Sequence, residues 1–429
     1  MRARALSCVR ALALFAAVLA IAAPLWPGAA GATSTPPPTP VGSHESPSPF
    51  PTVLHTPKPR PAPPRISATA AVLVDPRTGQ ILYDKRGNQK RPVASLTKIM
   101  TALLTLRRSH LDDVITIDKE TAHTPPSNLS LKVGEELTVR DLLDGLLLSS
   151  ANDAAVALAE HVSGTVPAFV ALMNRTARRL GMRHTRFASP NGLLDSGYST
   201  ARDMAKLTAA AYRIPRFRQI VDDRFATIPG PPGKPDRVLQ NRNVLLWLYR
   251  GATGVKTGFT VAAGWCLIAQ AGREGRTLLT VVLHAPTQGD SFSDGATLLN
   301  YGFDEFQPSL LAVPGETAGA VLLGGEPVTA AAADRLVRLV REDRLGDVAS
   351  AFVPGPGVSL PVAKGERIGV LRFRTGRLVL GSVPLVATES AAAPPPGAPA
   401  PPPAALGPPV ESALHLLYAV GRSTLGSLL

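Results

Sequence analysis

The chain has 429 residues, of which 45% are hydrophobic, and it carries a formal net charge of +13 at pH 7. This length provides for two hydrophobic cores even after its tails are removed. Aromatic residues make up only 5% and the positive charge is dispersed, which argues against a nucleic-acid partner. No His/Cys cluster stands at metal-ligand spacing, which argues against a zinc peptidase.

The N-terminus has the pattern of an export signal. Three arginines precede an apolar run over residues 11–23, and Ala30-Gly31-Ala32 offers a small-x-small cleavage site. Residues 1–32 are therefore predicted to be a signal peptide; the alternative is an uncleaved membrane anchor, for which the apolar run is short. Cleavage removes three arginines and no acidic residue, so the net charge falls from +13 to +10, which suits an anionic surface.

Only one cysteine, Cys266, would remain in the exported chain, so no internal disulfide is expected and a buried, inert thiol is predicted.

Residues 33–65 are dense in Pro, Ser and Thr and are predicted to form a disordered tether. A domain is expected over residues 66–305. Its first strands, 70–75 and 80–83, should pair with a 265–283 hairpin in one antiparallel sheet around a helical middle.

The first motif is Ser95-Leu96-Thr97-Lys98, followed by an apolar helical pattern. Spacing of three places Ser95 and Lys98 on one helical face, with Ser95 at the N-terminus, where the dipole favours developing negative charge. A serine nucleophile needs a group that takes its proton, and lysine does this when burial or a neighbouring cation lowers its pKa. A lone Ser-x-x-Lys is more often an N-cap followed by a surface lysine.

The second motif, Ser150-Ala151-Asn152, lies between two apolar helical stretches. Such a polar turn at a cleft would let Ser150 relay a proton and the Asn152 amide bond a substrate. The alternative is an ordinary N-cap, since Ser-x-Asn also occurs as Ser189-Pro190-Asn191.

The third motif, Lys256-Thr257-Gly258, opens a β-prone region with a hairpin turn predicted at residues 272–275. On an edge strand, Lys256 and the Thr257 hydroxyl would hold a carboxylate, and Gly258 would let the backbone approach a ligand. The alternative is a polar strand start.

Residues 306–390 contain short β-prone runs between Gly and Pro, with a charged helix predicted over 332–342, and form a small β-rich domain without a catalytic constellation. A Pro/Ala-rich linker over 391–409 leads to an amphipathic helix over 410–429. Such a helix would attach the protein to a membrane surface; the alternative is docking on the protein itself.

The three motifs occur in the order found in class A β-lactamases and penicillin-binding proteins. The chain resembles the low-molecular-mass penicillin-binding proteins of the D-alanyl-D-alanine carboxypeptidase family. The matching segments are 71–75, 92–101, 152–154, 190–193, 198–205 and 263–266. The resemblance covers residues 66–305 and, more loosely, the region after them. It implies an α/β (α+β) serine β-lactamase/penicillin-binding transpeptidase-like domain with an antiparallel sheet and a helical subdomain, followed by the small β-rich domain.

By this resemblance, Ser95 is acylated by the penultimate D-alanine carbonyl and Lys98 is the base. Ser150 and Asn152 assist proton transfer and substrate binding. The substrate is the pentapeptide stem of peptidoglycan, β-lactams are inhibitors, and neither metal nor organic cofactor is required. The protein would act at the outer face of the cytoplasmic membrane or in the cell wall.

The same resemblance implies that Lys256 and Thr257 recognise the terminal carboxylate, and that the backbone amides of Ser95 and Phe259 form the oxyanion hole. Two positions depart from the family pattern. Phe259 stands where some members have His, and Ser189 stands where Asn usually precedes the Pro-x-Gly-Leu stretch.

Three other activities remain as alternatives: a β-lactamase, a non-hydrolytic penicillin-binding wall protein, and an endopeptidase acting on cross-links. Class A β-lactamases deacylate through a glutamate placed between the second and third motifs. Residues 161–258 contain no glutamate, which favours the carboxypeptidase.

Overall fold

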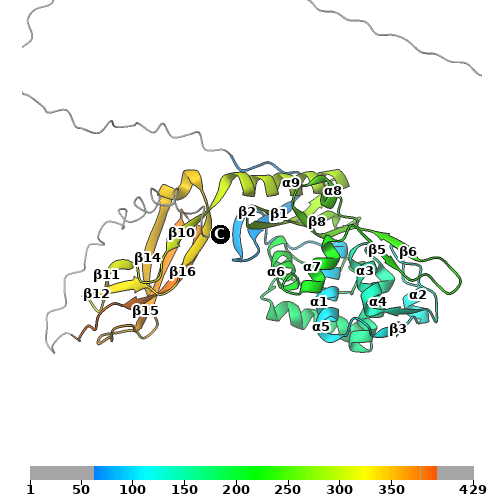
Figure 1. Ribbon diagram of the computed structural model, residues 1–429, viewed down its shortest axis with the longest axis horizontal. Coiled ribbons are helices and arrows are strands. Elements are labelled where there is room, and N and C mark those ends of the chain that lie inside the picture. The colour runs from blue at the N-terminus through cyan, green and yellow to red at the C-terminus, as the bar shows by residue number, and fades with distance from the viewer. Residues whose placement is uncertain (1–61, 377, 394–429) are drawn as a thin grey trace, which may run out of the picture. The chain divides into compact units, whose positions relative to one another are not determined.

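The computed structural model describes residues 62–376 and 378–393 (Figure 1). The predicted signal peptide and C-terminal helix lie outside the described residues, as do most of the two Pro-rich segments. All of the described residues belong to a single unit of the chain.

A five-stranded antiparallel sheet with the order β2-β1-β9-β8-β7 organises the first region. Its strands are β1 (Ala70–Asp75), β2 (Gln80–Lys85), β7 (Ala252–Thr260), β8 (Gly264–Arg273) and β9 (Arg276–Ala285). The predicted pairing of the first strands with the later hairpin is confirmed, because β1 pairs with β9 from Ala70↔Leu283 to Val74↔Leu279. β7 forms an edge of the sheet, so one side of its backbone remains free of a neighbouring strand.

Both faces of this sheet are covered. Helix α9 (Gln288–Glu305) lies on one face, and a set of helices lies on the other (Figure 1). The side chains of β1 alternate accordingly: Ala71 and Leu73 join the core beneath α9, whereas Val72 and Val74 join the core beneath the other helices. This two-sided burial explains why all six residues of β1 are buried.

The helical subdomain contains η1 (Ala94–Thr97), α1 (Lys98–Arg108), α2 (Lys119–Ala122), α3 (Val139–Leu147), α4 (Asn152–Ser163), α5 (Val166–Arg179), α6 (Ala201–Ala211), α7 (Pro215–Asp222) and α8 (Leu245–Leu248). Two short antiparallel strand pairs accompany them: β3 (Val114–Thr116) with β4 (Glu136–Thr138), and β5 (Phe225–Ile228) with β6 (Arg237–Gln240). Side-chain caps fix where several helices begin; Thr138 and Asp141, for example, form a capping box at α3.

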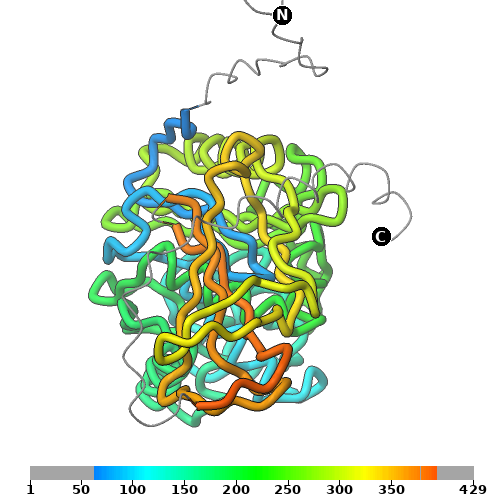
Figure 2. Tube along the Cα trace, turned by 90° about the vertical axis from the view of Figure 1, so that its left-hand side faces the viewer, coloured from blue at the N-terminus to red at the C-terminus, as the bar shows by residue number. Residues whose placement is uncertain are grey.

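Residues after α9 are β-rich, as predicted. β10 (Phe306–Ala312) pairs with β13 (Leu336–Arg341), and a second sheet has the order β11-β12-β16-β15-β14. Its strands are β11 (Thr317–Leu323), β12 (Glu326–Ala332), β14 (Val348–Pro354), β15 (Arg367–Thr375) and β16 (Leu378–Ala387), with the short helix η2 (Glu342–Asp347) before β14. Figure 2 traces these strands in yellow to red, running alongside one another.

The helix predicted over residues 332–342 is wrong, because most of this segment is strand β13. Leu336 and Val340 are spaced as on a helical face, yet both are buried in a core that also contains Leu311 of β10. Pairing with β10 therefore overrides the local pattern, and the β-branched valines of the segment suit a strand.

Within the described ranges, no single helix has both the length and the apolar character to cross a membrane. α4 and α5 pass that test only as a pair, bent by 83°.

Candidate active site

Ser95 lies in the short helix η1, directly before α1. The preceding residue, Ala94, has a φ of 47°, a value that non-glycine residues adopt rarely and mostly where the surroundings enforce it. The turn also packs against β7: a Cβ added to Gly258 would stand 3.1 Å from Ser95 N and 3.2 Å from Leu96 N. Gly258 thus allows the edge strand to approach the backbone that carries Ser95.

Lys98 is the first residue of α1, and its side chain is fully buried. Its Nζ lies 2.8 Å from Ser95 Oγ, 2.7 Å from Asn152 Oδ1 and 2.8 Å from the carbonyl oxygen of Asn191. Burial lowers the pKa of Lys98 well below its usual value, and the nearby charges of Lys256 and Arg242 lower it further. A lysine in this setting is suited to accept a proton from Ser95.

The second motif contributes Asn152 to the site. This residue begins α4, and its amide bridges two partners, since Oδ1 accepts from Lys98 and Nδ2 donates to Pro125 O at 3.0 Å. Ser150 is buried with a φ of 62°, and its hydroxyl makes no hydrogen bond to any described residue. That hydroxyl is therefore available to a bound molecule.

Two further cations lie beside Lys98. Lys256 on β7 is 1% exposed, and its Nζ donates to Thr257 O at 3.0 Å. Burial and then the charge of Arg242 lower the pKa of Lys256 to about 7. Arg242 belongs to no motif, so no sequence pattern points to it, and only the folded chain brings it close to the lysines. The clustered positive charge favours an anionic ligand.

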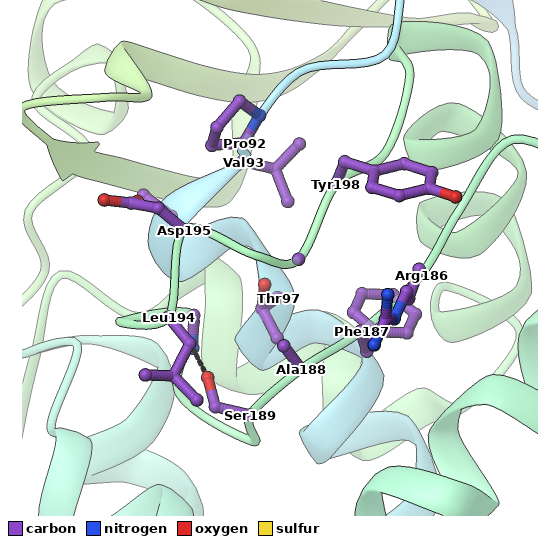
Figure 3. A pocket seen from close by; sticks show the side chains of 13 residues that line it. Pro92, Val93, Thr97, Arg186, Phe187, Ala188, Ser189, Leu194, Asp195 and Tyr198 are labelled. Atoms are coloured by element: carbon purple, nitrogen blue, oxygen red, sulfur yellow. Dashed lines mark hydrogen bonds between the residues drawn. The ribbon is translucent and has the colours of Figure 1, made fainter.

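The turn after Ser189 closes the site behind Lys98. Ser189 Oγ accepts from Gly192 N at 3.0 Å, so the serine fixes this turn in place of the asparagine usual at its position. Thr101 Oγ1 donates to Pro190 O at 2.6 Å, which ties the turn to α1. Figure 3 shows Ser189 among the side chains that line a small pocket between residues 92–97 and 186–198.

The remaining predicted residues extend along β7. The Thr257 hydroxyl makes no hydrogen bond within the described part of the chain. The Phe259 ring is 47% exposed and stacks on Trp265, with ring centroids 4.3 Å apart. Phe259 pairs with Trp265 across the β7–β8 ladder, and its backbone amide is the group predicted to contact the reacting oxygen.

The arrangement provides a hydroxyl nucleophile, a buried amine that contacts it, and two cations beside them. This is the equipment for acyl transfer to a serine from a substrate that carries an anionic group. Among the described residues, no three His, Cys, Asp or Glu side chains are grouped so as to hold a metal ion.

A family model described as D-alanyl-D-alanine carboxypeptidase matches residues 58–287. The D-alanyl-D-alanine carboxypeptidase DacF of Bacillus subtilis (strain 168) is 31% identical over 344 residues, which span 75% of this chain and 85% of that protein.

Two solved structures are similar as well. The D-alanyl-D-alanine carboxypeptidase DacD from Francisella tularensis has a TM-score of 0.66 and 28% identity, covering 78% of this chain and 96% of that one. Penicillin binding protein 5 from Haemophilus influenzae has a TM-score of 0.65 and 30% identity, covering 78% of this chain and 100% of that one.

The turn behind Lys98 yields a stability prediction. Gly192 has a φ of +83°, and a Cβ there would stand 2.0 Å from Ala94 O, whereas Gly79 has a φ of +74° with open space around it. Gly79→Ala should cost only the left-handed strain, about 1 kcal/mol, and Gly192→Ala should cost clearly more because the turn must move. Urea unfolding followed by circular dichroism measures both; equal losses would contradict the tight packing.

Proposed function

This chain belongs to the D-alanyl-D-alanine carboxypeptidase family of penicillin-binding proteins, and we propose that Ser95 is the residue through which it acts. It is a serine-type carboxypeptidase of peptidoglycan. The observation that carries the residue assignment is the 2.8 Å contact between Lys98 Nζ and Ser95 Oγ, made by an amine whose pKa is strongly lowered by burial. Lowering the pKa of an amine favours its neutral form, and only the neutral amine is able to take the serine proton.

In the acylation step, Ser95 Oγ bonds to the carbonyl carbon of the penultimate D-alanine as its proton passes to Lys98. The backbone amides of Ser95 and Phe259 would stabilise the oxyanion that forms. The peptide C–N bond then breaks, and the departing D-alanine receives a proton from Lys98, relayed by Ser150. The stem peptide remains as an ester on Ser95.

In the second step, a water molecule attacks the ester carbonyl and gives its proton to Lys98. The ester C–O bond breaks and Ser95 recovers its proton, which releases the shortened stem and restores the starting protonation. Asn152 would hold Lys98 in place during both transfers, since its Oδ1 lies 2.7 Å from Nζ.

Recognition of the terminal carboxylate falls to Lys256, Thr257 and Arg242. Lys256 supplies a buried positive charge, and the Thr257 hydroxyl is free for a ligand within the described residues. Charge-assisted hydrogen bonds to a carboxylate are among the stronger polar contacts, and burial strengthens them further. Substrates with a free C-terminal carboxylate should therefore be hydrolysed faster than those without one.

Ser95 should be the only acylated residue. After incubation with a fluorescent penicillin, peptide mapping should find the label on Ser95, and Ser95→Ala should remove it. The penicilloyl enzyme should persist far longer than the peptidyl enzyme, because no glutamate stands between the second and third motifs. Label on another serine would end the assignment, and rapid repeated penicillin hydrolysis would favour the β-lactamase alternative.

Lys256 should set the alkaline limb of the pH profile. Its lowered pKa of about 7 means that the free enzyme loses this charge as the pH rises through 7, so kcat/KM for a D-Ala-D-Ala peptide should fall there. Lys256→Arg should move this limb to higher pH, because guanidinium stays protonated. Lys256→Ala should cost roughly 1.5–3 kcal/mol, or about 10- to 150-fold in kcat/KM.

A matched peptide with a C-terminal amide provides the control for this measurement. It lacks the carboxylate, so its slower hydrolysis should show no shift of the alkaline limb in Lys256→Arg. If Lys256→Ala hydrolyses the free-acid peptide as fast as the parent protein, Lys256 has no part in recognition.

We infer from sequence alone that residues 1–32 export the protein and that residues 410–429 attach it to the outer face of the cytoplasmic membrane. The apolar face of the 410–429 segment supports attachment, as does the linker before it. Deleting residues 410–429 should release the protein into the soluble fraction with its peptidase activity intact. If the truncated protein stays with the membrane, an uncleaved N-terminal segment becomes the better anchor.

A further inference from the structure

Residues 124–135, here called the cleft loop, contain none of the three motifs, yet they contact the second motif directly. Pro125 O accepts from Asn152 Nδ2 at 3.0 Å, and Ser127 O accepts from Asn152 N at 2.7 Å. An amide NH2 group only donates, so the Pro125 carbonyl determines which end of Asn152 faces Lys98. The position of the cleft loop therefore determines that the amide oxygen of Asn152, and not its NH2 group, faces Lys98.

The cleft loop is held from two sides. On one side, Asp153 accepts from Leu129 N at 2.9 Å and from Leu131 N at 3.3 Å. On the other side, Arg237 Nε donates to Leu129 O at 3.2 Å, and Arg242 Nη1 donates to Ser127 Oγ at 2.9 Å. Arg237 lies on β6 and Arg242 follows that strand, so one short stretch of chain carries both arginines.

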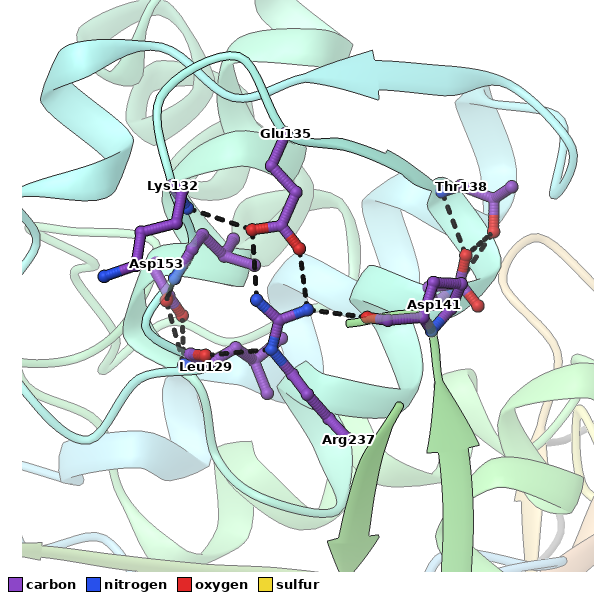
Figure 4. Close-up of polar contacts among 9 residues, drawn as sticks. Leu129, Lys132, Glu135, Thr138, Asp141, Asp153 and Arg237 are labelled. Carbon is purple, nitrogen blue, oxygen red and sulfur yellow. Dashed lines mark hydrogen bonds and ion pairs between the residues drawn. The ribbon is translucent and has the colours of Figure 1, made fainter. Parts of the chain in front are cut away.

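The strongest of these attachments is an ion pair between Arg237 and Glu135 (Figure 4). Their two hydrogen bonds measure 2.6 and 3.0 Å, and the side chains are only 15% and 2% exposed. Glu135 also accepts from Lys132 N at 3.0 Å, and Arg237 donates to Pro229 O at 2.6 Å. A bidentate pair restricts geometry strongly, although a buried pair adds little net stability compared with apolar side chains.

We propose that Glu135 and Arg237 form a positioning pair for acyl transfer. Through Leu129 and the cleft loop, they hold the Pro125 and Ser127 carbonyls where these orient Asn152 toward Lys98. Neither side chain touches the reacting atoms, so neither is a catalytic residue. The inference rests on the proposed function, because it assigns the pair to the step in which Lys98 takes the proton of Ser95.

Loosening the cleft loop has a definite consequence for Lys98. Three charged groups face its amine: Lys256 on β7, Arg242 after β6 and Asp153 on α4, of which only Asp153 favours the protonated form. Burial is the main reason that the pKa of Lys98 is lowered. Water admitted by a displaced cleft loop would raise that pKa. The Lys98 amine would then be neutral only at higher pH. The rise of the acylation rate on the acid side of its pH profile, here called the acid limb, should therefore move to higher pH.

The test measures the second-order rate constant of acylation by a fluorescent penicillin against pH. The first variant, Glu135→Gln, keeps the side-chain volume and removes the negative charge. The second, Arg237→Lys, keeps the positive charge and removes the paired guanidinium contacts to Glu135. Both should slow acylation at pH 7 on the order of tenfold to a hundredfold, as expected for a misplacement of about 1 Å. Both should also move the acid limb to higher pH.

A matched control pair lies elsewhere in the helical subdomain. Arg216 and Asp144 are 23% and 14% exposed and 3.0 Å apart, and neither side chain bonds to the cleft loop within the described residues. Asp144→Asn should lower the melting temperature while leaving the acid limb where it is. A loss of stability alone therefore does not reproduce the expected effect.

If Glu135→Gln and Arg237→Lys fold and acylate with the parent pH profile, the pair is only structural and the proposal is overturned. Should either fail to fold, Ser127→Ala decides the matter, because it removes only the anchor to Arg242 at a half-exposed position. It should shift the acid limb in the same direction, and an unchanged limb would overturn the role of the cleft loop. A parent protein that is not labelled at Ser95 would instead end the proposed function itself.

Discussion

The catalytic region depends above all on the burial of Lys98. Its side chain has no access to solvent, and its three hydrogen bonds go to three separate segments. Those segments are the turn of Ser95, the start of α4 and the loop at Asn191. Burying an amine favours its neutral form, which is the form able to accept a proton. The packing of helices against the sheet thus gives Lys98 the character required of the proposed base, and that character depends on every segment around it.

The positive charge around Lys98 is the second constraint. Lys256 and Arg242 are both buried enough for their pKa values to be lowered, and they depress that of Lys98 in turn. Like charges held together in a poorly solvated cleft oppose folding, whereas an anionic ligand relieves the repulsion. If the site binds a carboxylate as proposed, stability is exchanged for affinity, an exchange common at functional sites. Asp153 partly offsets this positive charge and also accepts hydrogen bonds from the cleft loop. The same side chain therefore affects both the charge around Lys98 and the position of the loop.

The sequence by itself determined the elements that depend on local pattern. Apolar strands with Gly/Pro punctuation predicted the sheet and its pairing, since side-chain periodicity and turn chemistry are local properties. The order of three short motifs, together with the family resemblance, pointed to Ser95, Lys98, Asn152 and Lys256, which the folded chain brings close together. The same local logic failed for residues 332–342, where spacing fits a helix and pairing with β10 makes a strand.

Only the tertiary structure decided how the cleft is supported. Arg242, Glu135 and Arg237 stand in no motif, and their partners lie about a hundred residues away in sequence, as with Arg237 and Glu135 at a separation of 102. Lys98 also donates to the carbonyl oxygen of Asn191, 93 residues away in sequence. The sequence could not predict this partner, because every residue has a backbone carbonyl. Burial, lowered pKa values and charge repulsion arise from such long-range packing. The sequence therefore predicts which side chains take part in the reaction, and only the fold sets the burial and charge around each of them.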